Sequence, residues 1–150
     1  MTQSDGTLLN DLAARVLGDL GGAVSVPLVR IGDALGLYRA LAEIGLANAD
    51  ALAEAAGCAP RYVREWLAAQ AASGYAHHEG GRFSLTPEQP LVFVEPDSPV
   101  NLIGAFDTAA AMVENQPKVQ VAFKTGSGVA WGDQPGCMFC AVARLSGRAM

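Results

Sequence analysis

The chain has 150 residues, a length that suggests one domain, or one domain with an extension that contacts a partner. Hydrophobic residues make up 51% of it and charged residues 17%, so it carries more apolar surface than one small core can bury. The formal net charge of −5 argues against a protein that wraps phosphate backbones, because sequence-independent affinity for nucleic acid comes from clustered lysine and arginine.

The N-terminal segment lacks the basic start and uninterrupted apolar run of a secretory signal. We also expect no segment to be long enough and uncharged enough to span a bilayer. Three cysteines, an odd number, fit reduced thiols better than a disulfide framework. The sequence therefore predicts a cytoplasmic protein that does not contact membranes.

Apolar residues recur every three or four positions in the first part of the chain, residues 1–46. They predict an amphipathic helix over 8–20 that ends at Gly21-Gly22, and a second helix that Ser25 caps. The run "GLYRALAEIG" adds a short third helix. Apolar stripes of this kind need a partner, and the readiest one is the same surface of a second subunit. The predicted homodimer interface consists of Leu12, Val16, Leu28, Ile31 and Leu35.

Residues 47–95 carry the pattern of a winged helix. Asn48 is a predicted N-cap for the helix "ADALAEAA", and Gly57 ends that helix. Pro60 then opens "RYVREWLAAQAASG", because proline is favoured at the first position of a helix. The strand-like runs "YAHHE" and "RFSL" flank Gly80-Gly81 and predict a β-hairpin.

Residues 96–150 are predicted to form linker helices and a C-terminal tail. Just before this region, Thr86 is expected to cap one short helix. A second helix is expected to start at Ser98, and a third to start at Pro117 and end at Gly126. The fold class is therefore mainly α with a small β-hairpin wing. It is a winged helix-turn-helix preceded by N-terminal dimerisation helices and followed by linker helices.

A winged helix first suggests DNA, with the second helix of the pair in the major groove. The candidate contacts are Arg61, Arg64 and Arg82. Glu65 lies among them, and alanines fill positions where a helix that reads DNA usually carries long polar side chains. A small DNA-binding transcriptional regulator stays the alternative function.

Cys137 and Cys140 have the spacing of half a zinc site or of a redox pair. No second ligand pair follows them, so we expect a packed segment, with a zinc or redox module as a third interpretation. His77 and His78 are neighbours on a strand and point to opposite faces, so they cannot readily share an ion. We predict no metal ligands, no catalytic residues and no cofactor-binding residues in this chain.

Several runs together resemble the N-terminal part of an actinobacterial family of S-adenosylmethionine-dependent methyltransferases, members of which are labelled transcriptional regulators because of their winged helix. These runs are "VLGDLGGAVSVPLVRIGDALGLYRALAEIG", "APRYVREWLAAQAASGY", "GRFSLTPEQ", "DSPV" and "FKTGSGVAWGDQ". The resemblance implies that the N-terminal helices and winged helix dimerise, and that a C-terminal Rossmann domain carries S-adenosylmethionine. It also implies that the helices after the wing roof a substrate pocket, with Phe106, Met112 and Trp131 as candidates for its wall.

The Rossmann domain that the resemblance places after Arg144 is absent from this chain. The family is expected to continue with a segment like "FRPGY", whereas the chain reads "LSGRAM". With assumed codons, one inserted T converts these residues to Leu-Phe-Arg-Pro-Gly-Tyr, so we hypothesise a truncated, frameshifted remnant of a longer gene. The expected function is the dimerisation and substrate-roofing domain of a class I small-molecule methyltransferase. Alone, the chain is expected to be inactive and to hold neither cofactor nor substrate.

Overall fold

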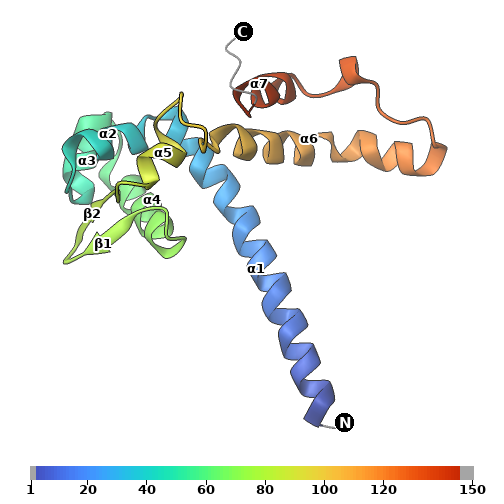
Figure 1. The fold of residues 1–150 in the computed structure, drawn as a ribbon, viewed down its shortest axis with the longest axis horizontal. Helices are drawn as coiled ribbons and strands as arrows, with labels where there is room; N and C mark the ends of the chain where they lie inside the picture. The colour runs from blue at the N-terminus through green and yellow to red at the C-terminus, as the bar shows by residue number, and fades with distance from the viewer. Residues whose placement is uncertain (1–2, 146–150) are drawn as a thin grey trace.

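A computed structural model describes residues 3–145 and shows a winged helix from which two long helices extend in different directions (Figure 1). The frameshift hypothesis concerns the final run "LSGRAM", and the residues of this run after Leu145 lie outside the described range. The predicted fold class is confirmed. The elements are α1 (Gln3–Ala34), α2 (Leu37–Ile44), α3 (Ala49–Ala56), α4 (Pro60–Ala72), β1 (His77–Glu79), β2 (Arg82–Ser84), α5 (Gln89–Phe93), α6 (Ile103–Thr125), the 3-10 turn η1 (Trp131–Asp133) and α7 (Gly136–Leu145).

Helix α1 is one continuous helix of 32 residues, so the predicted stop at Gly21-Gly22 is wrong. Both glycines keep a negative φ, and each lowers helix stability by only about 1 kcal/mol relative to alanine. Packing of the later part of α1 against the core, where Val29 is fully buried, offsets that penalty, because tertiary contacts supply most of the stability of a helix in a protein. Ser25 lies inside the helix rather than at its start, and its hydroxyl donates to the carbonyl of Gly21 at 3.2 Å. Pro27 also lies within α1.

In the winged helix, by contrast, the caps, the first residue of α4 and the hairpin turn lie as predicted, while β1 begins at His77, two residues inside its predicted run. The Asn48 side chain accepts from the backbone N–H of Ala51 at 2.9 Å, and Gly57 ends α3 with a left-handed φ of 63°. Pro60 is the first residue of α4. Gly80 and Gly81 have φ of 56° and 77°, as a two-residue hairpin turn between β1 and β2 requires. The domain boundaries at residues 46 and 95 stay a prediction.

The core of the winged helix is built around the Tyr38 ring, which is 1% exposed. It stacks on Phe93 with 4.8 Å between ring centroids and meets the edge of Trp66 at 4.9 Å. The Tyr38 hydroxyl donates to Oε1 of Gln70 at 2.5 Å, and Trp66 Nε1 donates to the carbonyl of Leu28 at 2.9 Å. These contacts join α1, α2, α4 and α5 into one unit.

Helix α6 differs from its prediction at both of the proposed breaks. It begins at Ile103 rather than Ser98, because the Asn101 side chain accepts from the backbone N–H of Ile103 at 3.1 Å and so starts the helix there. It then continues through Pro117, where we expected a separate helix. Gly126 ends α6 with a left-handed φ of 72°, as predicted.

Helix α5 also starts later than predicted, at Gln89. The expected cap, Thr86, does not supply its side chain to the first turn of α5. Instead Oε1 of Gln89 accepts from the backbone N–H of Thr86 at 2.8 Å, so the bond runs in the opposite direction. Nε2 of Gln89 donates to the carbonyl of Gly74 at 2.9 Å, which joins α5 to the end of α4.

Gly32 is the residue of α1 that lies closest to the core rings. A Cβ at this position would lie 2.4 Å from Cζ2 of Trp66 and 2.7 Å from Cε2 of Tyr38. Gly32→Ala is therefore expected to lower the free energy of unfolding in urea by about 1–3 kcal/mol. Gly22→Ala is the matched control, because its Cβ meets open space and should raise stability by about 0.5–1 kcal/mol. Equal effects of the two substitutions would contradict the close packing.

Tyr38 also predicts how stability depends on pH. Burial, with smaller contributions from Tyr75 and Asp33, raises the pKa of the Tyr38 phenol above its usual range. Since the unfolded phenol ionises near pH 10, the stability from this group is present below about pH 10 and is lost as pH rises further. We expect urea unfolding to show a loss approaching about 1.4 kcal/mol per pH unit above that point.

The loss of unfolding free energy per pH unit above about pH 10 should be smaller in Tyr38→Phe than in the wild type. This substitution should also lower stability at neutral pH by about 1–3 kcal/mol, because Gln70 loses its hydrogen-bond partner. Tyr62→Phe is the control, since the Tyr62 ring is 74% exposed. It should keep the alkaline slope of the wild type. An unchanged slope in Tyr38→Phe would exclude Tyr38 as its source.

Candidate functional site

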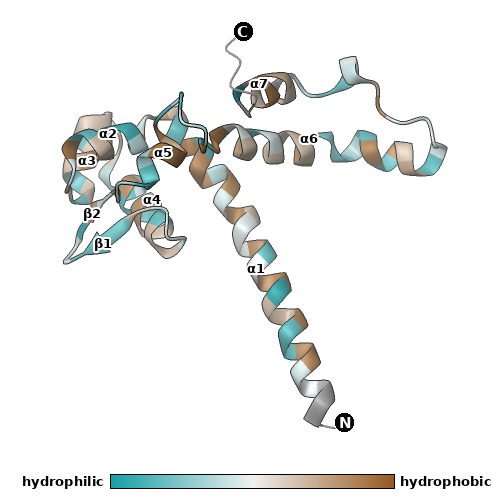
Figure 2. Cartoon of the chain, viewed as in Figure 1, coloured by the Kyte–Doolittle hydropathy of each residue, from teal (hydrophilic) through white to brown (hydrophobic). Residues whose placement is uncertain are grey.

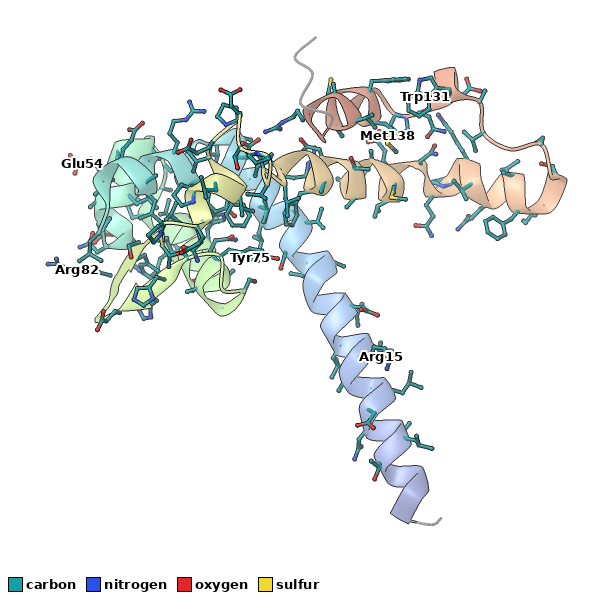
Figure 3. The ribbon with its side chains drawn as sticks, in the orientation of Figure 1. Arg15, Glu54, Tyr75, Arg82, Trp131 and Met138 are labelled. Carbon is teal, nitrogen blue, oxygen red and sulfur yellow. The ribbon has the colours of Figure 1, made fainter. Side chains whose placement is uncertain are left out.

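A groove that is open to solvent runs between α6 and the segment that returns through η1 to α7, with a volume of about 910 Å³. The residues from α6 recur every three or four positions, so they lie on one face of the helix. Figure 3 shows Met138 of α7 between α7 and α6. The lining consists of Met112, Asn115, Gln116, Val119, Gln120, Phe123 and Lys124 from α6, with Gln134 and Met138 opposite.

Two polar contacts hold the returning segment against α6. Nδ2 of Asn115 donates to Oε1 of Gln134 at 2.8 Å, and the Lys118 ammonium donates to the backbone carbonyl of Asp133. Asn115 is only 6% exposed, and its Oδ1 is buried with no hydrogen-bond partner among the described residues. Hydrogen bonds therefore hold the returning segment as one wall of the groove, and the buried Oδ1 of Asn115 is a hydrogen-bond acceptor without a described donor.

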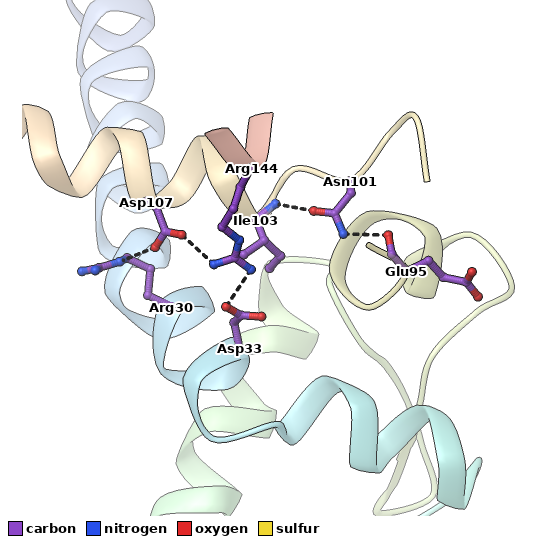
Figure 4. A network of polar contacts seen from close by, with 7 residues as sticks. All are labelled: Arg30, Asp33, Glu95, Asn101, Ile103, Asp107 and Arg144. Carbon is purple, nitrogen blue, oxygen red and sulfur yellow. Dashed lines mark hydrogen bonds and ion pairs between the residues drawn. The ribbon is translucent and has the colours of Figure 1, made fainter. Parts of the chain in front are cut away.

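An ion-pair network of Arg30, Asp33, Asp107 and Arg144 joins α7 to α1 and α6 (Figure 4). The Asp107 carboxylate, on α6, accepts from Nε of Arg30 at 2.9 Å and from Nη1 of Arg144 at 2.8 Å. Nη2 of Arg144 donates to Asp33 at 3.0 Å. The Asp107 side chain is 18% exposed, so it is screened less than a fully solvated carboxylate. The network fixes the end of α7, and with it the far wall of the groove.

The three predicted pocket residues do not lie together. Met112 lines the groove, whereas Phe106 packs against the winged-helix core, 6.3 Å from the Tyr75 ring. Trp131 is 61% exposed and meets the edge of the Phe139 ring at 5.2 Å. The sequence analysis missed Asn115 and the other amides. Their regular spacing was visible, but the predicted break at Pro117 divided the pattern between two helices.

Four of the predicted dimer residues lie on α1, which extends away from the winged helix, and Leu35 directly follows the end of that helix (Figure 1). Leu12, Val16, Ile31 and Leu35 are 46–59% exposed, while Leu28 packs against the core. Figure 2 shows hydrophobic residues along the whole of α1. The other exposed apolar side chains of α1 are Leu8, Leu9, Leu17, Leu20 and Val24. An unpartnered apolar surface of this size marks an interaction site.

Helix α1 also corrects the expectation about membranes. Residues Gly6–Ala34 are long and apolar enough, by length and composition, to cross a bilayer, and 11% of the apolar window is buried. The helix carries Asp11, Arg15 and Asp19 in its exposed part. An apolar helix that packs on another chain has the same composition, so this property alone does not place the chain in a membrane.

The predicted DNA-contact residues are all exposed. Arg64 lies 3.6 Å from a carboxylate oxygen of Asp50, so part of its charge is compensated within the winged helix. It lines a concave surface between α4 and the wing, together with His77 and His78. Arg61 lies on α4 and Arg82 on β2, both in contact with solvent. All three arginines are thus open to solvent, and their role in DNA contact stays a prediction.

No three His, Cys, Asp or Glu side chains among those described could hold a metal ion. Cys140 is exposed on α7 and Cys58 is half-buried, while the Cys137 side chain lies outside those described. Nε2 of His77 is 3.8 Å from the Glu79 carboxylate, whereas the His78 ring stacks on Phe83 at 4.5 Å. The two adjacent imidazoles therefore have different surroundings, as their positions on a strand require.

The described residues do not fit S-adenosylmethionine, the cofactor that the sequence resemblance implies. A dinucleotide or adenosyl site needs a parallel strand, a glycine-rich turn and the N-terminus of a helix. The sheet in the described part of the chain has two antiparallel strands. Gly126 and Gly128 follow the end of α6 rather than a strand. No chemical step can be derived through this cofactor from these residues.

The ion-pair network predicts what holds α7 in place. Arg144→Gln removes two partly exposed pairs, which are worth about 1 kcal/mol together, so hydrogen exchange in α7 should become about 3- to 10-fold faster. High salt should accelerate exchange in the wild type but not in the variant. Arg39→Gln, an exposed arginine on α2, is the control and should leave α7 unchanged. Unchanged protection in Arg144→Gln would show that packing on α6 alone holds α7.

Comparisons with known proteins agree with this architecture. The family model for the Rv2258c-like winged HTH domain matches residues 22–92. The solved structure of PigF with SAH has a TM-score of 0.64 and 18% identity, over 98% of this chain and 44% of that one. The mitomycin 7-O-methyltransferase MmcR has a TM-score of 0.66 and 22% identity, over 94% of this chain and 45% of that one.

A search of curated proteins found no significant match. The chain spans less than half the length of the two solved structures that it matches. The likeness to them is a likeness of fold, and it extends well beyond the winged helix to nearly the whole chain. Residues 22–92 thus match the model of the Rv2258c-like winged HTH domain, and nearly the whole chain shares its fold with part of each of the two solved structures.

Proposed function

We propose that this chain is the dimerisation and substrate-facing domain of a class I S-adenosylmethionine-dependent small-molecule methyltransferase that works in the cytoplasm. The observation that carries the proposal is the apolar, unpartnered surface of α1, in a chain with the fold of a methyltransferase N-terminal domain. The cofactor site and the methyl transfer would belong to a part of the protein outside these residues. The domain contributes assembly and one wall for the substrate.

The dimerisation role rests on the burial of α1. Its core-facing end is anchored, since Val29 is fully buried and Gly32 meets the core rings, whereas residues 7–24 are exposed. Burying an exposed leucine or valine is worth about 1.5–3 kcal/mol. The same face of a second copy offers leucines and valines at matching spacing, so a twofold pair buries both stripes at once. A homodimer is therefore the simplest way to cover α1.

The substrate-facing role rests on the groove along α6. A cavity of about 910 Å³ matches the size of small-molecule sites in proteins, and its lining combines apolar side chains with a few amides. Met112, a candidate for the wall of the substrate pocket, belongs to this lining. In the proposed enzyme this face of α6 would lie toward the substrate.

DNA binding is supported less well. The winged helix offers Arg61, Arg64 and Arg82, but Arg64 already lies near Asp50, and the net charge of the chain is −5. Helix α4 presents the small side chain of Ala68 to the concave surface beside the wing. Affinity for duplex DNA depends on the number of phosphates that lysine and arginine neutralise, and three arginines supply little of it.

The dimer is tested by placing a carboxylate on α1. Val16→Glu should dissociate it, because burying an unpaired charge costs several kcal/mol, and sedimentation velocity should show a dimerisation Kd at least about 10-fold higher. Ala14→Glu is the matched control, since Ala14 lies on the opposite side of the exposed helix from most of the leucines. It should leave the dimer intact. A wild-type chain that sediments as a monomer at micromolar concentration would contradict the proposal.

A further inference from the structure

The α6–α7 groove has a chemical character that narrows what it can hold. From its lining we infer that it binds a flat, apolar small molecule that carries one anionic group, such as an aromatic carboxylate or phenolate. This inference rests on the proposed substrate-facing role of the groove and names the substrate class.

The dimensions of the groove suit an elongated molecule. Its α6 residues run from Met112 to Lys124, twelve positions apart, which corresponds to about 18 Å along the helix axis. The Phe123 ring and the thioethers of Met112 and Met138 line it. Sulfur and aromatic groups of this kind make favourable contacts with flat rings.

Lys124 gives the groove its charge. Among the described residues it is the one charged side chain of the lining, and no described carboxylate lines the groove beside it. Within the part of the chain that the structure describes, no carboxylate forms an ion pair with its ammonium. An anionic ligand group would therefore gain an unshared positive charge, whereas a cationic ligand would be repelled.

Asn115 marks the opposite end of the site. It lies nine residues before Lys124, about 14 Å along the axis of α6. Its Nδ2 is used by Gln134, while its buried Oδ1 has no hydrogen-bond partner in the described structure. A hydroxyl or N–H of the ligand would supply the missing donor, with a small adjustment of the amide. The ligand would then carry a donor at one end and its anionic group at the other.

A second copy of the chain is the competing occupant of the groove. The amides of Asn115, Gln116 and Gln120 alternate with the apolar residues along the same face of α6. An apolar helix such as the exposed part of α1 would cover these amides without offering them partners, which is unfavourable. A small molecule with its own polar groups satisfies them better.

The inference is tested with two fluorescent probes that share their rings and differ in charge, anilinonaphthalene sulfonate and uncharged N-phenylnaphthylamine. We expect saturable binding of one sulfonate per chain. Lys124→Gln should weaken the sulfonate roughly 2- to 5-fold and leave the uncharged probe unchanged. Arg39→Gln removes an exposed positive charge outside the groove and should change neither affinity.

A second pair of variants tests the location. Val119→Trp fills the groove and should abolish the binding of both probes, whereas Val121→Trp adds the same ring to α6 outside the lining and should not. Circular dichroism confirms that each variant folds. The inference is overturned if Lys124→Gln affects both probes equally or neither, or if the two tryptophan variants bind alike.

Sedimentation of the same variants separates this inference from the proposed function. Loss of the dimer in Val119→Trp would assign the groove to a second copy and overturn the small-molecule site. If every variant is a dimer and Lys124→Gln does not change the affinity for the sulfonate, the small-molecule site is overturned and the dimerisation role is left intact. If Lys124→Gln weakens the sulfonate alone and every variant is a monomer, the small-molecule site is supported and the dimerisation role is overturned.

Discussion

The contact of Gly32 with the rings of Trp66 and Tyr38 is the constraint on which the rest of the structure depends. Because Gly32 has no side chain, α1 approaches the core closely enough for Trp66 to donate to the carbonyl of Leu28. This sets where α1 leaves the winged helix, and it places Arg30 and Asp33 beside α6 and α7. The position of α7 in turn decides the width of the groove. The close packing at Gly32 thus affects the position of α7, which forms the far wall of the groove.

The exposed part of α1 and the groove along α6 differ in their polar content, and this difference suits them to different binding partners. The exposed apolar side chains of α1 are all aliphatic, which suits a partner of the same kind and offers little geometric selectivity. The groove along α6 mixes apolar residues with amides and one lysine, so it can discriminate by hydrogen bonding and charge. In the proposed function, assembly and recognition of a small molecule would therefore be carried by different helices, which are joined at the Asp107 carboxylate.

The sequence predicted the winged helix well because its signals are local. The cap at Asn48, the left-handed Gly57 and the Gly80-Gly81 turn each depend on residues a few positions away. The predictions at Gly21-Gly22 and Pro117 were wrong because the stability of a helix in a protein depends mostly on tertiary packing, which the propensity of a single residue does not report. The groove and the ion-pair network were missed for another reason. Asp33 and Arg144 are 111 positions apart, and no local pattern reports such a contact.

The bond from Arg144 to Asp33 has a consequence for any assembly built on α1. Since α7 is fastened to the base of the same helix that would form the pair, a rotation of one α1 against the other moves both α7 helices with it. In a twofold pair the two grooves would then sit at one fixed separation and face in directions related by the symmetry axis. The spacing between two binding sites would be a property of the aliphatic contact, although no residue of that contact touches either ligand.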